Sequence, residues 1–430
     1  MALNPTDRRI LRLALPAAGA LAAEPLYRLV DTAIVGRLGT EQLGGVAVAV
    51  AILTLVIGGS NFLAYGTTQR VANRLGAGNT PGAADVGVQA FWLAAIIGAI
   101  AVPVLVVFAE PLASLLGARD EVLEFATTYL RISALGVPFV LVLLAAEGTQ
   151  RGASDYRSPL IVLVASNIVN VILEVVLVFG FDMGVAGAAW STVIAQMIAG
   201  LVLWRLTRPY TAAARTRRPR WSEMAPLLSA GRHLLLRVGS MMAVFTGATA
   251  VAARIDDPTL AAYSITMTMF SFLALTLDAL AIPAQTLVAE ELGKGGTGST
   301  EVAERSARLS LRIGFGLAVL LGLSAPLVSR LFTTDPAVIS RATAGLLILA
   351  VVMIPGSLAF STDGSLIGAG DYEFLGRAAL AYLVAVTPIA VIVLMFPELG
   401  IVGIWGGLLI WMVLRAVVNL RRTHQILGTT

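Results

Sequence analysis

The chain has 430 residues, of which 57% are hydrophobic and 13% charged, and its formal net charge is +4. Soluble domains are roughly 25% charged, so this composition excludes an ordinary soluble protein and predicts one that crosses a membrane several times. Cysteine is absent, which excludes disulfides and thiolate metal sites, and two histidines are too few for a typical histidine zinc site. No basic face interleaved with aromatic residues is present, which argues against a nucleic-acid partner.

Long apolar stretches recur from one end of the chain to the other. A transmembrane helix needs about 20 predominantly apolar residues. By that measure we predict twelve helices, approximately at residues 10–35, 43–70, 86–108, 122–145, 159–180, 185–205, 232–252, 260–289, 309–332, 342–361, 375–396 and 399–420. The predicted fold class is therefore an all-α membrane protein.

The first predicted helix carries ionisable residues in the stretch EPLYRLVDT, which begins at Glu24. Glu24 and Arg28 are four residues apart, and Arg28 and Asp31 are three apart, so all three share one helix face. Charged side chains within a membrane pair with one another or face a water-filled cavity. A structural salt bridge accounts for Glu24 and Arg28, but a single arginine cannot neutralise both carboxylates.

Two prolines, Pro16 and Pro25, lie in the same predicted helix. Each removes one backbone hydrogen bond, so the helix can bend at these positions. We therefore expect the two prolines to act as hinges through which the first helix responds to a change of charge at Asp31.

Basic residues are distributed unevenly between the two ends of the predicted helices. Of the 30 Lys and Arg residues, 23 fall on the side that holds both termini and the even-numbered loops, and eight of these lie from Arg205 to Arg237. Basic loops face the cytoplasm, so we expect both termini there. The segment RLTRPYTAAARTRRPR, from Arg205 to Arg220, is expected to be a linker and topology signal; a lipid-headgroup or regulatory site is the alternative.

The second half of the chain repeats the first at an offset of 216 or 217 residues. Matching positions include Arg37 and Arg254, Leu43 and Leu260, Leu75 and Leu292, Gly76 and Gly293, Gly148 and Gly364, Gly152 and Gly368, Gly184 and Gly400, and Gly187 and Gly403. A nearly constant offset across four loops predicts a duplicated unit. We expect an N-terminal lobe at 1–208 (helices 1–6), a cytoplasmic connector at 209–231 and a C-terminal lobe at 232–430 (helices 7–12).

Six helices in each lobe is an even number, so both lobes insert into the membrane in the same sense. They should then be related by a pseudo-two-fold axis along the membrane normal, as in some secondary transporters that rock about a central cleft. The phosphate-binding pattern GxxxxGK[ST] does not occur in the sequence. Transport would therefore not be powered by ATP bound to this chain.

Four stretches of the chain together resemble the multidrug and toxic compound extrusion (MATE) transporters, and most closely their DinF-like subgroup. They are LALPAAGALAAEPLYRLVDTAIVGRLG in the first helix, GTTQRVANRLGAGN after the second, GTQRGASDY after the fourth and NVILEVVLVFGFDMGVAGAAWSTVIAQ over the fifth and sixth. The resemblance covers essentially the whole chain. It implies an antiporter that exports organic, often cationic drugs or toxic metabolites in exchange for protons or sodium by alternating access, with no cofactor and no enzymatic activity.

The resemblance also implies a cation pocket in the N-terminal lobe. Matched by motif, its residues are Asp31, Tyr129, Asn170, Glu174 and Thr192. Sodium, if it is the coupling ion, would bind at Asp31, Asn170, Glu174 and Thr192, and no other metal site is expected. The family usually carries aspartate at the position of Glu174, and the longer side chain favours protons over sodium.

Helix geometry agrees with this pocket. With a rise of about 1.5 Å per residue, Asp31 and Glu174 lie about 6–10 Å inside the outer ends of their helices, and Tyr129 and Thr192 about 10–12 Å inside theirs. The carboxylates of the first helix and Glu174 then share only one cation, Arg28, so the cluster is net negative. Like charges in a poorly polarisable medium favour uptake of a cation. We therefore predict that protonation of Asp31, in which Glu174 also takes part, is the step that couples ion entry to export.

The C-terminal lobe does not copy this pocket, because the repeat partner of Asp31 is Ala248. Asp278, in the eighth predicted helix, is a candidate second proton site or a counter-ion for a cationic substrate. A hydrogen-bonded interior acid, or a partner for a base that the sequence does not identify, is the alternative interpretation of Asp278.

Three alternatives to a proton antiporter stay open at this point. Sodium-coupled antiport would use the same fold. A flippase for lipid-linked precursors tends to line its cleft with basic residues, whereas the predicted helices contain few apart from Arg28. A channel or receptor, from another functional class, would show no coupled exchange.

The expected location is the bacterial inner (plasma) membrane, because arginine outnumbers lysine 29 to 1, which suits a GC-rich bacterial genome. The expected partners are the lipid bilayer, small organic substrates and protons or sodium, with no nucleic acid. The expected state is a monomer.

Overall fold

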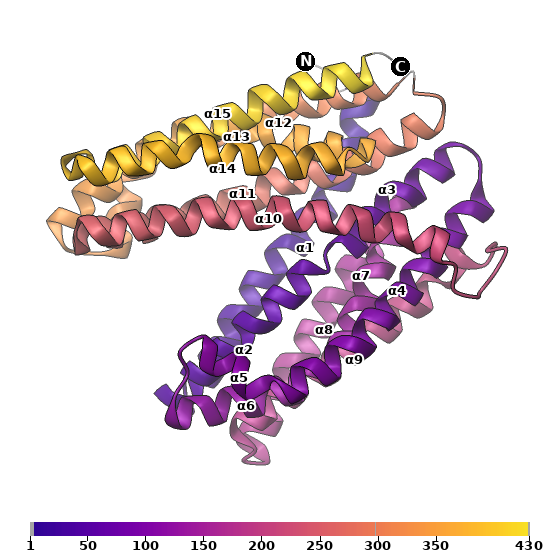
Figure 1. The fold of residues 1–430 in the computed structure, drawn as a ribbon, viewed down its shortest axis with the longest axis horizontal. Helices are drawn as coiled ribbons and strands as arrows, with labels where there is room; N and C mark the ends of the chain where they lie inside the picture. Colours follow the sequence, from indigo (N-terminus) through magenta and orange to yellow (C-terminus); the bar gives the residue numbers. More distant parts are fainter. Residues whose placement is uncertain (1–3, 297, 429–430) are drawn as a thin grey trace. The chain divides into compact units, whose positions relative to one another are not determined.

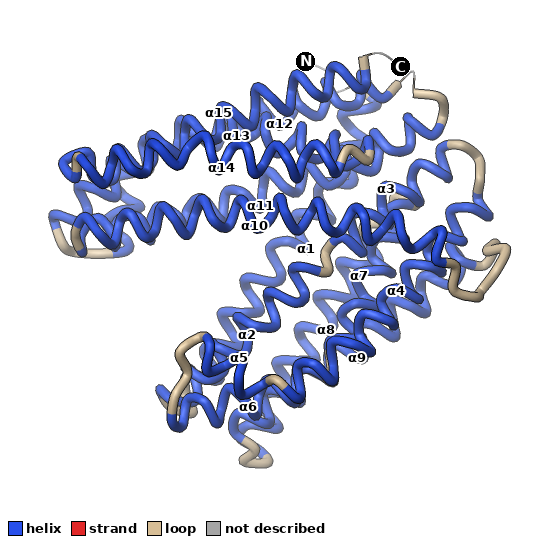
Figure 2. Tube along the Cα trace, in the orientation of Figure 1, coloured by secondary structure: helices blue, strands red, loops and turns tan. Residues whose placement is uncertain are grey.

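The computed structural model describes residues 4–296 and 298–428, and over this range every regular element is a helix (Figures 1 and 2). The α-helices are α1 Pro5–Val35, α2 Thr40–Gly59, α3 Phe62–Gly76, α4 Thr80–Val107, α5 Ala109–Leu115, α6 Asp120–Ala134, α7 Val137–Gly152, α8 Arg157–Val175, α9 Gly184–Thr211, α10 Trp221–Ile255, α11 Asp257–Gly293, α12 Ser299–Phe332, α13 Pro336–Ala369, α14 Tyr372–Met395 and α15 Gly400–Leu427. A π-helical turn, η1 Val176–Gly180, continues α8, and a 3-10 turn, η2 Pro397–Leu399, precedes α15.

All twelve predicted membrane helices have counterparts, so the all-α prediction is confirmed. The second and fourth are each divided, into α2 with α3 and α6 with α7; Pro138 lies in the first turn of α7, where a missing N–H costs least. Among the described residues, eleven segments are long and apolar enough to cross a membrane. The twelfth, α1, has 31 residues and is long enough, but its ionisable side chains lower its mean hydropathy.

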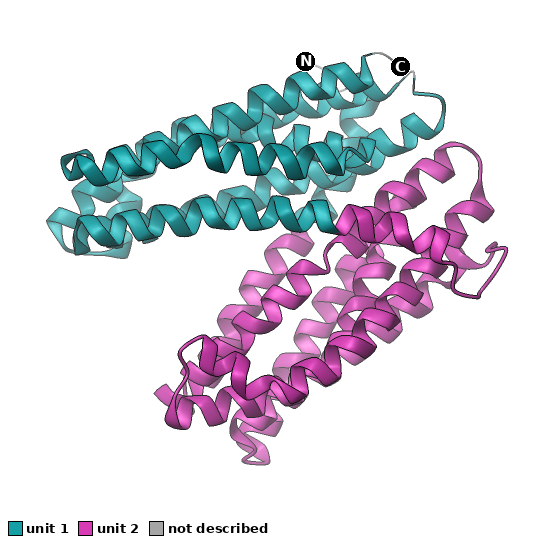
Figure 3. Cartoon of the chain, viewed as in Figure 1, with its two compact units in different colours: residues 1–18, 232–430 teal, residues 19–231 magenta. Residues whose placement is uncertain are grey.

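The helices form two compact units, coloured separately in Figure 3. Unit 2 contains residues 19–231, and unit 1 contains the described residues up to Ala18 together with those from Arg232 onward. The predicted lobes differ from these units at two places, because the connector at 209–231 packs with unit 2 and the start of α1 packs with unit 1. Helix α1 is thus one continuous helix that contributes to both units.

Ion pairs hold the start of α1 in unit 1. Arg9 Nη2 lies 2.5 Å from Glu290 Oε2 on α11, and Asp7 Oδ1 lies 3.8 Å from Arg305 Nη1 on α12. Arg9 and Glu290 are 281 residues apart in the sequence, so no local pattern could have paired them.

Repeated glycines have the same packing role in both units. A Cβ atom on Gly148 would lie 2.7 Å from the carbonyl oxygen of Ala64, and a Cβ atom on Gly364 would collide with the carbonyl oxygen of Ala281. Ala64 and Ala281 are themselves one repeat apart, so α7 approaches α3 as closely as α13 approaches α11. The repeat offset therefore marks helix–helix contacts in which a side chain has no room.

A second pair of repeated glycines starts a helix in each unit. Gly184 begins α9 with a φ of 52°, and Gly400 begins α15 with a φ of 49°. This left-handed backbone region favours glycine because a Cβ atom would be strained there. The same local requirement thus explains why both halves of the sequence keep glycine at these positions.

Replacing Gly364 with alanine is expected to lower the free energy of unfolding by about 1–3 kcal/mol, because the new methyl group must push α13 away from the α11 backbone. Gly148→Ala should act in the same way in unit 2. The matched control is Gly316→Ala, since a Cβ atom there meets nothing within 4 Å. Thermal unfolding in detergent measures all three variants, and an unchanged melting temperature for Gly364→Ala would contradict the packing argument.

Candidate functional site

The five residues of the predicted cation pocket lie in unit 2 on four different helices. Asp31 is on α1, Tyr129 on α6, Asn170 and Glu174 on α8, and Thr192 on α9. Hydrogen bonds and short-range electrostatic contacts connect all five side chains. The structure therefore brings together, at one place in unit 2, residues that were selected by motif from separate segments.

Glu174 is the most enclosed carboxyl group of this pocket. Its side chain is 0% exposed, and neither carboxylate oxygen accepts a hydrogen bond from any donor in the described range. Its titratable neighbour is the carboxyl group of Asp31. A buried carboxylate without a donor or a cation is costly, so this position calls for a proton or a bound cation.

The backbone changes its winding next to Glu174. Helix α8 ends at Val175, one residue after Glu174, and continues as the π-helical turn η1. Such turns are rare and are frequent at functional sites, because they re-aim side chains without ending the helix.

Asp31 contacts two tyrosines as well as Glu174. The hydroxyl of Tyr27 donates a hydrogen bond of 3.2 Å to Asp31 Oδ1, and Tyr129 lies within electrostatic reach of both carboxyl groups. Tyr27 was not among the predicted residues. It stands four positions before Asp31, on the same helix face, and that spacing was the available signal.

The structure confirms the predicted ion pair between Glu24 and Arg28. Arg28 Nη2 lies 2.7 Å from Glu24 Oε1, and the two side chains are 52% and 58% exposed, so they form an exposed ion pair apart from the buried pocket. Arg28 acts on Asp31 only through space. Asp31 and Glu174 are left facing each other, and neither has an ion-pair partner among the residues that the structure describes.

Asn170 and Thr192 complete the polar lining. Asn170 Nδ2 donates a hydrogen bond of 3.3 Å to Thr192 Oγ1, which itself donates to the carbonyl oxygen of Ala188 at 3.0 Å. Asn170 Oδ1 is buried and, like both oxygens of Glu174, accepts no hydrogen bond within the described range. These three oxygens suit a proton or a small hard cation.

The predicted hinge residues lie inside an unbroken helix. Pro16 and Pro25 are both within α1, which runs from Pro5 to Val35 without interruption. Neither proline marks a helix end in this structure, and their role as hinges stays a prediction.

Tyr27→Phe is expected to slow export about fivefold, because it removes one hydrogen bond of about 1 kcal/mol to Asp31 and leaves the ring in place. Tyr210→Phe is the matched control, since Tyr210 donates to another carboxylate, Asp155, at 3.0 Å. Asp155 precedes the start of α8, whereas Glu174 lies at the other end of that helix. Initial rates of dye export at equal protein level test this expectation. Equal rates for the two variants would remove Tyr27 from the site.

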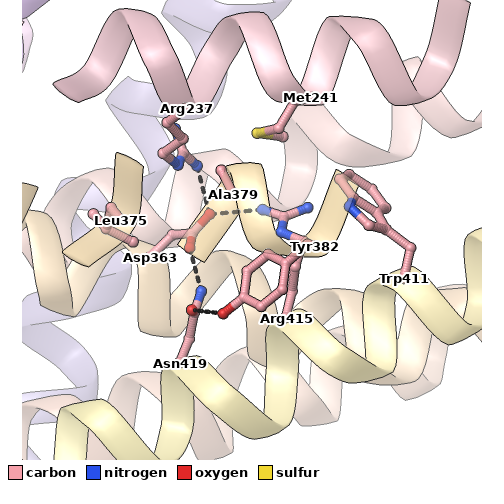
Figure 4. Close-up of a pocket in the computed structure, with 9 residues that line it drawn as sticks. All are labelled: Arg237, Met241, Asp363, Leu375, Ala379, Tyr382, Trp411, Arg415 and Asn419. Atoms are coloured by element: carbon pink, nitrogen blue, oxygen red, sulfur yellow. Dashed lines mark hydrogen bonds and ion pairs between the residues drawn. The ribbon is translucent and has the colours of Figure 1, made fainter. Parts of the chain in front are cut away.

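Unit 1 holds a second polar cluster, centred on Asp363 of α13 (Figure 4). Asp363 Oδ2 lies 2.5 Å from Arg237 Nη2 on α10 and 2.7 Å from Arg415 Nη2 on α15. Asn419 Nδ2 donates to Asp363 Oδ1 at 2.6 Å, and the hydroxyl of Tyr382 on α14 donates to Asn419 Oδ1 at 2.8 Å. Four helices of unit 1 therefore meet at one buried carboxylate.

Arg237 and Arg415 are functional-site candidates that sequence reasoning missed. Both were counted with the basic residues at inner helix ends, and the helices were described as poor in arginine. The structure places Arg415 inside α15, buried, with its guanidinium 4.6 Å from the ring centre of Trp411. The correction has a physical cause: Asp363 pairs with both arginines, and Asp278 lies within electrostatic reach of both, so acidic groups lie beside them in place of water.

Asp278, the predicted second acidic site, lies on α11 beside this cluster. It is half-buried and within electrostatic reach of Arg237, Asp363 and Arg415. Within the described range it forms neither a hydrogen bond nor an ion pair. Asp278 thus differs from Asp363, which has three partners.

An apolar cavity also lies within unit 1, between α10, α14 and α15. Its volume is about 170 Å³, it is partly open to the surroundings, and Thr387 is the single polar side chain among the residues that line it. Gly247, Gly403 and Gly407 form part of its wall, so the space arises partly where side chains are missing. Its apolar lining suits the apolar part of an organic ligand.

Comparisons with known proteins extend over nearly the whole chain. Residues 16–176 and 236–398 match the family model MatE. The sequence is 32% identical over 424 residues to Protein DETOXIFICATION 44, chloroplastic, from Arabidopsis thaliana, covering 95% of this chain and 81% of that protein. It is 29% identical over 436 residues to DNA damage-inducible protein F from Escherichia coli (strain K12), covering 99% and 94%. A crystal structure of MATE in the bent conformation matches with a TM-score of 0.92 at 21% identity, covering 99% of this chain and 96% of that one.

Proposed function

The chain belongs to the MatE family of multi-pass membrane transporters, and from this premise we propose that it exports small organic compounds, drugs or toxic metabolites, in exchange for protons by alternating access. The observation that carries the proposal is the Asp31–Glu174 pair. Two neighbouring carboxyl groups, one of them fully buried, have no basic ion-pair partner in the described range. Only uptake of a cation can relieve this arrangement.

Protons fit the pair better than sodium. A proton shared between Asp31 and Glu174 satisfies both carboxyl groups at once, with Tyr27 donating to the other side of Asp31. Sodium-coupled antiport is the alternative, since the unpaired oxygens of Asn170 and Glu174 are hard-cation ligands. The glutamate in place of the usual aspartate changes the reach of one ligand and thus favours the proton.

Helix α1 is the element that would transmit the charge change. Its start is held in unit 1 by the Arg9–Glu290 ion pair, and its end carries Asp31 in unit 2. Protonation of Asp31 changes its hydrogen bonding to Tyr27, one turn away on the same helix. We propose that α1 responds by bending at Pro16 and Pro25, where backbone hydrogen bonds are missing.

Unit 1 supplies the proposed cargo contacts. The apolar cavity between α10, α14 and α15 suits the body of an organic compound. Asp278, half-buried and without a hydrogen bond among the described residues, is proposed as a second proton site or as the counter-ion of a cationic cargo. Arg237 and Arg415 are both paired with Asp363 inside unit 1, so they do not favour a flippase for phosphate-bearing lipids.

The proposed setting is the inner membrane of a bacterium, with both termini in the cytoplasm and a monomer as the working unit. The uneven distribution of basic residues supports this orientation.

Dye transport in proteoliposomes tests the proposed exchange. A cationic fluorescent dye is followed under an imposed pH gradient and then under an imposed sodium gradient. Proton antiport predicts that the pH gradient drives dye movement and that adding dye dissipates the pH gradient. A response to sodium alone would assign sodium coupling, ion flux without dye exchange would indicate a channel, and no response to either gradient would overturn the proposal.

A further inference from the structure

The connector between α9 and α10 is a non-helical strap, residues 212–220, whose backbone is fastened to α4 (Figure 2). The N–H of Arg215 donates to Asp85 Oδ1 at 2.8 Å, and the N–H of Arg220 donates to Gln89 Oε1 at 2.7 Å. Gln89 Nε2 donates in turn to the carbonyl oxygen of Arg218 at 2.9 Å. Asp85 and Gln89 are both buried side chains of α4, so their hydrogen bonds hold the strap backbone in one position.

Exposed arginine side chains cover this strap and the end of α9. We call them the connector arginines: Arg205, Arg208, Arg215, Arg217, Arg218 and Arg220. None of the six forms an ion pair with any residue that the structure describes. Arg215 Nη2 reaches Asn79 Oδ1 at 3.4 Å, and the Arg208 guanidinium lies 4.4 Å from the ring centre of Trp204. None of the six guanidinium groups therefore has a carboxylate partner in the described range, because the carboxylate of Asp85 accepts from the strap backbone instead.

Acidic residues at this end of unit 2 are already engaged. Glu223 forms ion pairs with Arg70 at 3.0 Å and Arg74 at 2.8 Å. Partial burial alone would raise the pKa of Asp155, but hydrogen bonds from the neighbouring turn and from Tyr210 outweigh it and lower the pKa below its ordinary value. Asp155 is thus ionised but satisfied, and neither acid is available to the connector arginines.

Apolar and aromatic surface borders the charge. Exposed tryptophans near the strap are Trp92, Trp204 and Trp221, which is 66% exposed. The indole N–H of Trp92 also holds a strap carbonyl at 2.7 Å. Tryptophan concentrates at the headgroup level of membranes. Leu201 and Leu206 on α9 are exposed as well, so a charged patch continues into a surface for acyl chains.

We propose that the connector arginines bind the phosphate of an anionic phospholipid, such as phosphatidylglycerol, whose acyl chains lie along the exposed apolar face of α9. Guanidinium groups bind phosphate oxygens in pairs, and several together form a lipid-headgroup site. A topology signal needs positive charge only during insertion and gains nothing from a backbone fastened at fixed points. The adjoining apolar face favours a phospholipid over a free phosphate ion. This site is independent of the ion pocket at Asp31.

Native mass spectrometry of the purified full chain counts the bound phosphatidylglycerol and phosphatidylcholine molecules. The test variant is the triple Arg215→Gln, Arg217→Gln, Arg218→Gln. Three arginines near a lipid surface together strengthen the binding of an anionic lipid about a hundredfold, so the triple should bind phosphatidylglycerol about a hundredfold more weakly, with phosphatidylcholine unchanged. The matched control, Arg308→Gln, Arg330→Gln, Arg377→Gln, removes the same charge from exposed positions in unit 1 and should behave as the unaltered protein.

Two outcomes overturn the proposal. One is equal retention of phosphatidylglycerol by the test triple and the control triple. The other is displacement of phosphatidylglycerol by millimolar inorganic phosphate, which would assign the patch to free anions. Should the glutamine triple not fold, the corresponding Arg→Lys triple keeps the charge but loses the paired geometry, and it must then show weaker retention than the unaltered protein.

Discussion

Asp31→Asn is expected to reduce gradient-driven export to the level of empty vesicles while leaving a folded, membrane-inserted protein. The substitution keeps the size of the side chain and the hydrogen bond from Tyr27, but it removes the carboxyl group that we propose to share a proton with Glu174. Without a group that binds and releases the ion, the two conformations cannot be driven by its gradient. Dye efflux under an imposed pH gradient measures the loss, and thermal unfolding in detergent verifies the fold.

Asp371→Asn is the matched control for this experiment. Asp371 also forms an interaction with a named partner, an ion pair with Arg422 at 2.8 Å. It lies in unit 1, directly before α14, and is not part of the pocket. Asp31→Glu, which restores a carboxyl group, should recover part of the export. Undiminished efflux by Asp31→Asn at equal protein level would eliminate Asp31 as the coupling residue.

Asp363→Ala is expected to lower the free energy of unfolding by about 3–5 kcal/mol, because it leaves two arginines without their shared counter-ion inside unit 1. Arg415 is the more affected of the two, since it is buried against Trp411 and cannot reach water. The amide of Asn419 loses its acceptor as well. The loss should appear as a lower melting temperature in detergent and a lower yield of monodisperse protein.

Asp278→Ala separates this structural effect from a functional one. Asp278 lies on the neighbouring α11 and makes no hydrogen bond or ion pair in the described part of the chain, so its removal should change the melting temperature little. If Asp278 takes part in coupling or in cargo binding, its variant should instead lose export. Equal melting temperatures for Asp363→Ala and Asp278→Ala would contradict the assignment of Asp363 as the structural centre of unit 1.

Much of the fold could be predicted because its signals are local. Runs of apolar residues identify helices by length alone, and all twelve were found in this way. The repeated glycines were visible as a constant offset, although only the structure explains them: Gly148 and Gly364 allow two helix backbones to touch, and Gly184 and Gly400 adopt a left-handed backbone. The break between α6 and α7 and the short helix α5 were not predicted, because neither changes the apolar pattern.

The residues of the candidate site could be predicted, but the direct approach of Asp31 to Glu174 could not. Motif resemblance selected Asp31, Tyr129, Asn170, Glu174 and Thr192, and the structure brings these five residues to one place. Helix spacing left Arg28 within reach of both Glu24 and Asp31, and the structure pairs it with Glu24. Positions three and four residues away on a helix are both within reach, and which of them an arginine pairs with depends on what else packs against each carboxylate.

The sequence by itself determined the membrane character of this protein, its twelve helices and its internal repeat, because hydrophobic length and period act within one segment of chain. Only the tertiary structure decided which charges are neutralised. Arg237 on α10 and Arg415 on α15 meet Asp363 on α13, whereas Asp31 and Glu174 meet each other and no cation within the described range. The physical reason is that the energy of a buried charge depends on groups brought near it by packing, and those groups are distant in the sequence.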